Sequence, residues 1–69
     1  MDPLVTDLAH SLGGFEPLSD LVGTEFPDLD IPTCDLSLRT DKLRFARFLM
    51  SQDRVKDFLW RKLEEEGLP

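Results

Sequence analysis

The positions of glycine and proline constrain this chain of 69 residues more than any other feature. Gly13-Gly14 and Gly23 are typical helix stops. Pro27 and Pro32 lack a backbone donor and disfavour the helical conformation in the residue before each of them. Any helix before Pro32 is therefore short. Because two turns of helix are unstable alone in water, we expect these segments to pack against the rest of the chain.

The first segment has the pattern of an amphipathic helix. Asp2-Pro3 is a typical opening, since Asp accepts hydrogen bonds from free amides and Pro fits the first helical position. Gly13-Gly14 is the expected end. At about 100° per residue, five apolar side chains fall within one arc: Leu4, Val5, Leu8, Ala9 and Leu12. We expect this stripe to pack on the core, and a dedicated partner-binding helix is the alternative.

A second, shorter helix is predicted from Phe15 to Val22. Pro17 suits its first turn, and Gly23 is the expected stop. Its pattern places Leu18, Leu21 and Val22 on one side.

The segment from Gly23 to Arg39 begins without a helical pattern. Leu29 alternates with Ile31, and Leu36 alternates with Leu38. This alternation allows a short hairpin, although strands of about three residues without a third partner are weak. An extended segment that lies over the helices is a second possibility. A helix that already begins at Asp35 is a third.

The C-terminal part has the pattern of two helices. Thr40 is the expected cap of the first, with Asp41 near the positive end of the helix dipole. The apolar side changes direction at Ser51-Gln52-Asp53, which offers new capping residues. We therefore predict helices from Asp41 to Met50 and from Gln52 to Glu66, the second ended by Gly67 and Pro69. One long helix is the alternative.

The predicted fold is mainly all-α. It is a small bundle of three to four short helices with an extended or hairpin-like segment near residues 24–39. A chain of this size buries only about 60% of the surface that its unfolded form exposes, so we expect a single compact domain of marginal stability. Four large apolar side chains are expected in the core: Phe45, Leu49, Phe58 and Leu63.

The two halves of the chain differ in charge. Residues 1–38 contain eight acids and no Lys or Arg, whereas residues 39–69 contain eight bases and six acids. The resulting charges of −8 and +2 account for the net charge of −6. This partition predicts that the acidic amphipathic half (residues 1–38) contacts either the helical half (residues 39–69) or a partner with a basic surface.

Residues that support catalysis or metal binding are sparse. His10 and Cys34 are the only residues of their kinds, and no nucleophile with a base, phosphate loop or metal pattern accompanies them. We therefore expect no enzymatic activity, no cofactor and no metal site. A single cysteine excludes an internal disulfide, and the chain has no export signal or long apolar run. We expect an intracellular location, cytoplasmic or nuclear, and no contact with a membrane.

Large apolar residues and acids are mixed between Phe15 and Ile31, without a base. This pattern is similar to that of transcriptional activation segments and other groove-binding peptides, in which apolar anchors enter the groove and acids meet its basic rim. The alternative is that the apolar residues complete the core. The predicted partner-binding residues are Phe15, Leu18, Leu21, Val22, Phe26 and, in the helical half, Trp60.

The sequence favours a small, acidic, non-enzymatic protein-binding module. Such a module is an adaptor, an inhibitor or a transcription-regulatory segment that occupies a basic or apolar groove on a larger protein. A disordered activation segment over residues 1–38, joined to a helical dimerisation unit, is a further hypothesis. A homodimer is also compatible with the sequence.

The alternative function is a DNA-binding regulator that uses the C-terminal helices like a helix-turn-helix protein. A basic cluster at the start of the first of these helices supports it: Arg39, Lys42, Arg44 and Arg47. However, a chain with a net charge of −6 gains little from contacts with phosphates, so nucleic acid is the less favoured partner.

Overall fold

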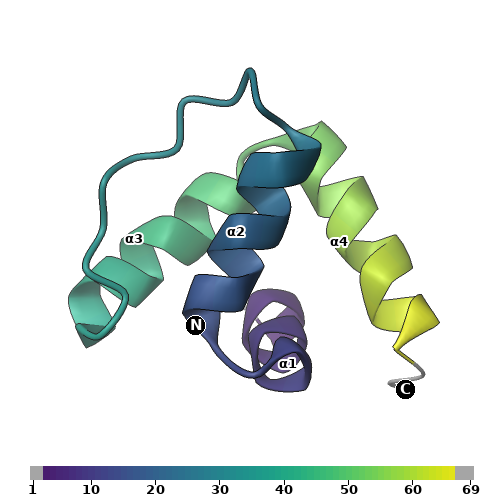
Figure 1. The fold of residues 1–69 in the computed structure, drawn as a ribbon, viewed down its shortest axis with the longest axis horizontal. Helices are drawn as coiled ribbons and strands as arrows, with labels where there is room; N and C mark the ends of the chain where they lie inside the picture. Colours follow the sequence, from purple (N-terminus) through teal and green to yellow (C-terminus); the bar gives the residue numbers. More distant parts are fainter. Residues whose placement is uncertain (1–2, 67–69) are drawn as a thin grey trace.

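A computed structural model describes residues 3–66, which form four helices and no strand (Figure 1). The prediction of a mainly α-helical bundle is confirmed. The expected cap Asp2 and the expected stops Gly67 and Pro69 lie outside the described residues. The helices are α1 (Pro3–Leu12), α2 (Phe15–Glu25), α3 (Arg39–Met50) and α4 (Asp53–Glu65).

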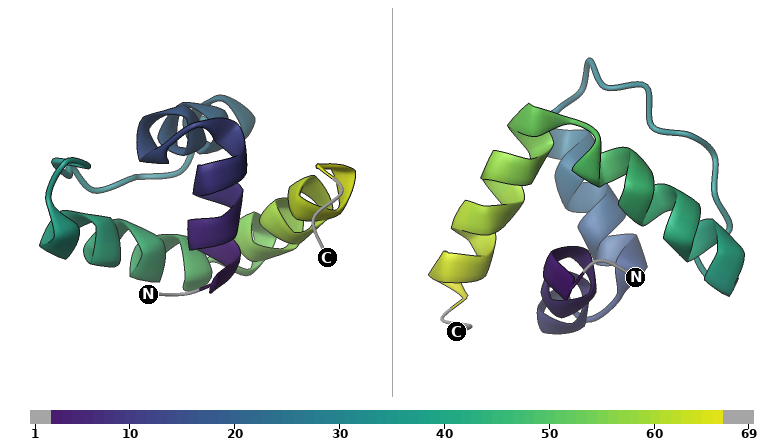
Figure 2. Two further views of the ribbon diagram at one scale, coloured as in Figure 1. Left: turned by 90° about the horizontal axis from the view of Figure 1, so that it is seen from below. Right: turned by 180° about the vertical axis from the view of Figure 1, so that it is seen from behind.

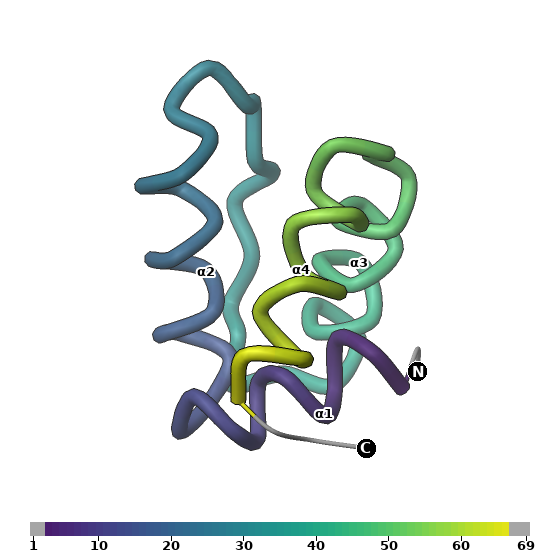
Figure 3. The backbone as a smooth tube through the Cα atoms, turned by 90° about the vertical axis from the view of Figure 1, so that its right-hand side faces the viewer, coloured from purple at the N-terminus to yellow at the C-terminus, as the bar shows by residue number. Residues whose placement is uncertain are grey.

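The helices are arranged in two layers. Helices α3 and α4 form a V, and α2 lies across its open angle (Figures 1 and 2). Seen from the side, α2 stands opposite α3 and α4, and α1 crosses between the two layers at one end (Figure 3). Helix α1 contacts both α2 and α4. The segment between α2 and α3 runs in a wide arc from the C-terminal end of α2 to the start of α3 (Figure 1).

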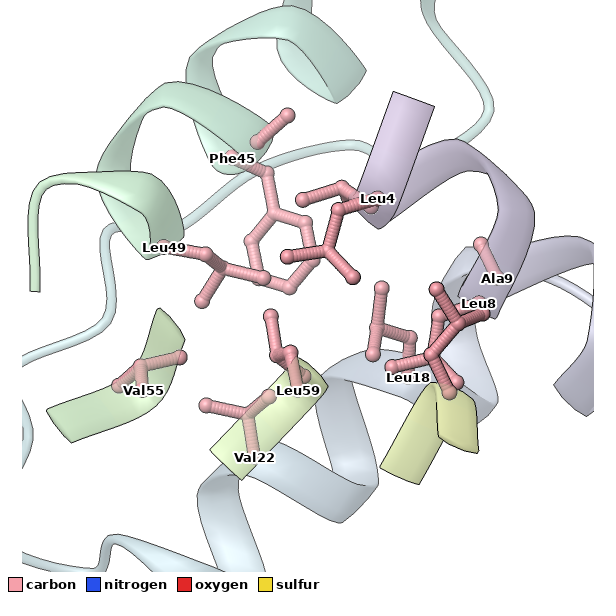
Figure 4. Close-up of a cluster of buried hydrophobic side chains, with 12 residues drawn as sticks. Leu4, Leu8, Ala9, Leu18, Val22, Phe45, Leu49, Val55 and Leu59 are labelled. Carbon is pink, nitrogen blue, oxygen red and sulfur yellow. The ribbon is translucent and has the colours of Figure 1, made fainter. Parts of the chain in front are cut away.

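The core takes apolar residues from all four helices. Leu8, Leu18 and Leu59 have no exposed surface. Leu4, Phe45 and Leu59 point toward the same interior space (Figure 4). Full burial of a side chain of this size contributes about 1.5–3 kcal/mol, so this core is the main source of stability. The buried residues are Leu4, Val5, Leu8, Ala9, Leu18, Val22, Phe45, Ala46, Leu49, Val55, Leu59 and Leu63.

Two glycines terminate α1 as predicted. Gly13 has a φ of 97° and Gly14 a φ of 145°, values that side chains with a Cβ rarely adopt. The Gly14 amide donates to the Ala9 carbonyl at 2.7 Å, and the Gly13 amide donates to the His10 carbonyl at 3.2 Å. This pair of bonds is the Schellman motif, which satisfies carbonyls at a helix end.

Helix α2 differs from its prediction at the C-terminal end. It continues through Gly23 to Glu25, because Gly23 keeps a negative φ inside the helix. Phe26 is the C-cap residue of this helix, and its amide donates to the Val22 carbonyl at 2.9 Å. Phe26 precedes Pro27, and proline disfavours the helical conformation in that position. Proline, and not glycine, is therefore the stop signal.

The segment from Phe26 to Leu38 is extended, and the hairpin is not formed. Leu29, Ile31 and Leu36 are half-buried and pack against the core, so this part of the predicted alternation is an alternation between core and solvent. Leu38 does not follow it, because its side chain is 50% exposed. Asp35 begins a turn instead of a helix. Its carboxylate accepts hydrogen bonds from the amide and hydroxyl of Ser37, at 3.1 and 2.6 Å.

The start of α3 corrects the predicted cap. The helix begins at Arg39, one residue before Thr40, and its N-cap residue Leu38 provides no side-chain hydrogen bond. Thr40 therefore lies inside the first turn and is not the cap. Asp41 lies in the first turn of α3, near the positive end of the helix dipole, as predicted. Its carboxylate also accepts a hydrogen bond from the Asp35 amide at 2.8 Å and so ties the turn to the helix.

The C-terminal part forms two helices, as predicted. The break lies at Ser51, whose hydroxyl donates to the Phe48 carbonyl at 2.6 Å. Helix α4 begins at Asp53, with Gln52 as its N-cap residue. The core prediction is confirmed for Phe45, Leu49 and Leu63, but Phe58 is only half-buried.

Candidate functional site

Two of the predicted partner-binding residues belong to the core. Leu18 and Val22 are completely buried on the inner side of α2. They contact α1, α3 or α4 residues of the same cluster, so a partner can reach them only if α2 leaves the fold. The inner side of α2 is therefore occupied, and the alternative reading of these two residues as core residues fits the structure.

Two predicted aromatic residues lie at the edges of the core. The Phe15 ring meets the Phe45 ring edge-on, with centroids 6.5 Å apart, and Lys42 Nζ lies 5.4 Å from the Phe15 centroid. The Phe26 ring meets the half-buried Phe58 ring at 5.4 Å. Such contacts fix the orientation of each ring and leave part of it at the surface.

The last two predicted residues are outside the core cluster. Trp60 is 49% exposed on α4, immediately after the buried Leu59. Leu21 is partly buried on α2, like Phe15 and Phe26, but unlike them it is not packed against the core cluster. The two residues lie on different layers of the bundle (Figure 3).

Leu21 shares α2 with three exposed acids, Glu16, Asp20 and Glu25. Glu25 lies one helical turn after Leu21 and beside it, whereas Asp20 and Glu16 lie about 100° and 140° round the helix from it. We call Glu16, Asp20, Leu21 and Glu25 the acidic face. The sequence pattern identified the stretch from Phe15 to Ile31, but it did not reveal that only Leu21 among its aliphatic residues is not packed against the core cluster.

The charges of the acidic half are directed to solvent. All seven acids between residues 3 and 38 are exposed. One ion pair joins the described parts of the two halves: Arg54 Nη2 to Asp28 Oδ2, at 3.1 Å. The other two ion pairs lie within α3 and within α4. Internal pairing between the halves therefore explains little of the charge partition.

Two of these acids have lowered pKa values, for local reasons. The hydrogen bond from Arg54, the backbone contact at Asp28 and the Arg54 charge lower the pKa of Asp28. The hydrogen bonds from the hydroxyl and amide of Ser37 lower the pKa of Asp35. Both groups are fully charged at neutral pH, and both are outside the acidic face.

The basic cluster predicted at the start of the C-terminal half separates in the structure. Lys42 is half-buried against Phe15, and Arg44 pairs with Asp41 at 3.4 Å. Arg39 and Arg47 are exposed and form no ion pair with residues 3–66. Leu43 lies one turn from each of them and is not packed against the core. The spacing of four residues between Leu43 and each arginine is visible in the sequence, but the sequence does not reveal that Leu43 is outside the core cluster.

Two open pockets flank the turn between α1 and α2. One has a volume of about 440 Å³ and is lined by Thr6, His10 and Phe15 among others. The other, of about 340 Å³, includes Lys42 and Ser37. The described residues contain no buried polar side-chain atom without a hydrogen bond and no group of three potential metal ligands.

Comparison with known proteins gives no match: no family model, curated protein or solved structure is similar to this chain. None of the four helices has the length and apolar content that spanning a membrane requires.

Proposed function

We propose that this protein is a non-enzymatic binding module whose acidic face docks onto a basic surface of a larger protein. The observation that carries the proposal is the exposure of all seven acids of residues 3–38, of which only Asp28 pairs with a base. Exposed charges of one sign repel one another in the free protein. A cationic partner removes that repulsion, so binding is more favourable for this arrangement than for scattered acids.

The acidic face has the composition of a small docking site. Leu21 supplies an apolar contact that is available without any change in the fold. Asp20 and Glu25 beside it meet basic side chains at the rim of a groove, where complementary charges increase the association rate and fix the orientation. One apolar residue in the centre usually contributes more to the affinity than the charged rim.

The proposed mode of action is occupation of a surface. A module of this kind acts as an adaptor or an inhibitor, or regulates transcription, when the basic surface that it covers otherwise binds another acidic ligand. The free thiol of Cys34 is compatible with a reducing compartment, and we propose a cytoplasmic or nuclear location.

Affinity capture tests this function when it is combined with charge reversal. The purified chain is used to capture a partner from an extract of its source cells, and the complex is then reconstituted from purified components. We expect the double variant Asp20→Lys, Glu25→Lys to lose binding by at least about tenfold, the loss that 1.4 kcal/mol produces. The affinity should also decrease as salt increases, because exposed charges are screened within about 8 Å at physiological ionic strength.

The matched control is Asp57→Lys with Glu64→Lys. These acids are exposed on α4 and form no ion pair within residues 3–66, and their reversal changes the net charge by the same amount. The control variant should retain most of the affinity. If both double variants lost the same affinity, the loss would be an effect of net charge alone. If the variant Asp20→Lys, Glu25→Lys bound the partner as tightly as the parent chain, the acidic face would be excluded as the binding site.

A further inference from the structure

The exposed side of α3 carries a second surface that the proposed function does not use. Arg39 and Arg47 are exposed and make no ion pair with the described residues, and Leu43 lies between them without contact to the core cluster. Residues four apart are neighbours on a helix surface, so the three side chains form a continuous strip. We call Arg39, Leu43 and Arg47 the basic face.

The basic face and the acidic face carry opposite charge. Each includes one partly buried leucine that is not packed against the core cluster, Leu43 on α3 and Leu21 on α2. Arg39 and Arg47 lie one turn before and one turn after Leu43. On α2, Glu25 lies one turn after Leu21, and Asp20 lies about 100° round the helix from it. The two helices belong to opposite layers of the bundle (Figure 3), so one molecule cannot bring its own two faces together.

We propose that the chain self-associates head to tail, with the basic face of one copy on the acidic face of the next. In this contact the arginines pair with Asp20 and Glu25, and Leu43 packs against Leu21. The net charge of −6 does not prevent it, because the screening length of about 8 Å at physiological salt is much shorter than the smallest extent of the molecule, 18 Å. At the contact between two copies, the charges of the basic face therefore interact mainly with the acidic face of the neighbouring copy.

In a head-to-tail dimer, one copy still has a free acidic face and the other copy still has a free basic face. Further copies add at these ends unless the geometry closes a ring. A protein partner on the acidic face competes with the addition of a copy at that position. The inference uses the same acidic face as the proposed function, but it concerns the purified chain alone, so either proposal can fail without the other.

Nucleic acid is the other acidic ligand that the basic face could take, and a second copy is favoured over it. A duplex that approached the basic face would meet only two unpaired arginines, and its affinity depends on the number of phosphates neutralised. The second copy offers both the charges and an apolar residue for Leu43.

Sedimentation equilibrium of the purified chain tests the inference. We expect the average mass to rise above the monomer mass of 7.9 kDa as the concentration approaches about 1 mM, where weak complexes are populated. The rise should be lost in about 1 M salt, where the screening length is about 3 Å. Binding of a duplex DNA probe at physiological salt, without self-association, would overturn the proposal in favour of nucleic acid.

A charge swap makes the test specific. The variants Arg39→Glu, Arg47→Glu and Asp20→Lys, Glu25→Lys should each remain monomeric, because each then has two faces of like charge. An equimolar mixture of the two should associate again, because every face of one variant is complementary to a face of the other. Both variants still have a negative net charge, so attraction of the whole molecules cannot explain the recovery.

The matched single variants are Arg47→Glu and Arg61→Glu, which change the net charge equally. Arg61 is exposed on α4, outside the basic face, and its reversal should leave self-association intact. Melting curves establish that each variant is folded. A parent chain that stays at the monomer mass up to about 1 mM, or a mixture of the double variants that remains monomeric, would overturn the inference.

Discussion

At the scale of single residues, exposure changes abruptly along α4. Leu59 has no exposed surface, whereas the next residue, Trp60, is 49% exposed. The helix turns by about 100° per residue, so adjacent residues face different surroundings. The indole of Trp60 is larger than the Leu59 side chain, yet the contribution of Leu59 to stability should be the greater one.

Truncation of these two residues provides a direct comparison. We expect Leu59→Ala to lower the free energy of unfolding by about 2–5 kcal/mol, because it leaves a cavity in the shared core. We expect Trp60→Ala to change it by about 0.5 kcal/mol or less, as for other surface substitutions. Urea denaturation followed by circular dichroism measures both. A larger loss for Trp60→Ala would mean that α4 presents a different side to the core.

The sequence predicted some individual residues and not others. Phe45, Leu49 and Leu63 follow from helical spacing, because the apolar stripe of each helix is continuous there. Phe58 lies at the edge of its stripe and faces Phe26, so its exposure depends on where the extended segment lies. Likewise, helical spacing places Leu18, Leu21 and Val22 on one side of α2, and only the position of the other helices separates Leu21 from the two core residues.

At the scale of the helices, the two glycine positions of α1 and α2 have opposite roles. Gly13 adopts a positive φ of 97° at the end of α1. Gly23 lies inside α2, and a Cβ added there would meet no atom within 4 Å. Glycine is required at the first position and weakens the helix at the second.

Alanine substitution at each glycine should therefore have opposite effects. We expect Gly23→Ala to raise the free energy of unfolding by about 0.5–1 kcal/mol, through helix propensity. Gly13→Ala should lower it by about 1–2 kcal/mol, because a Cβ in the left-handed conformation approaches the following carbonyl. For a domain of this size, 1 kcal/mol corresponds to a change in Tm of about 4–8 °C, which a thermal melt resolves. Destabilisation by Gly23→Ala would contradict the continuous α2.

Helix boundaries were harder to predict than the helices themselves. Periodicity identified all four helices because it is summed over many residues. A helix boundary depends on one or two residues, and neighbouring residues can favour different end points. In α2, Gly23 did not end the helix, whereas Pro27 did. At α3, Thr40 had the chemistry of a cap, but the helix follows the turn that begins at Asp35 and starts at Arg39, two residues earlier than predicted. That turn is held by a hydrogen bond from the Asp35 amide to the Asp41 carboxylate.

At the scale of the whole molecule, apolar contacts join the two halves, and charges contribute little. The core draws on both halves, with Leu8 and Leu18 from one and Phe45 and Leu59 from the other. Asp28 and Arg54 form the only ion pair between the described parts of the halves, and both of their side chains are about two-thirds exposed. Exposed pairs of this kind contribute little to stability. The charge partition was visible in the sequence, but whether the acids faced inward could be decided only from the fold.

The acids of residues 3–38 are displayed to solvent, and attraction to the bases of residues 39–66 does not hold the two halves together. The dependence of stability on salt tests it most directly, through the urea midpoint at low ionic strength and in about 1 M NaCl, where the screening length falls to about 3 Å. We predict a midpoint that is unchanged or higher in salt, because screening relieves repulsion among the exposed acids. A midpoint that falls clearly as salt is added would show that attraction between the halves stabilises the fold, and would contradict the claim.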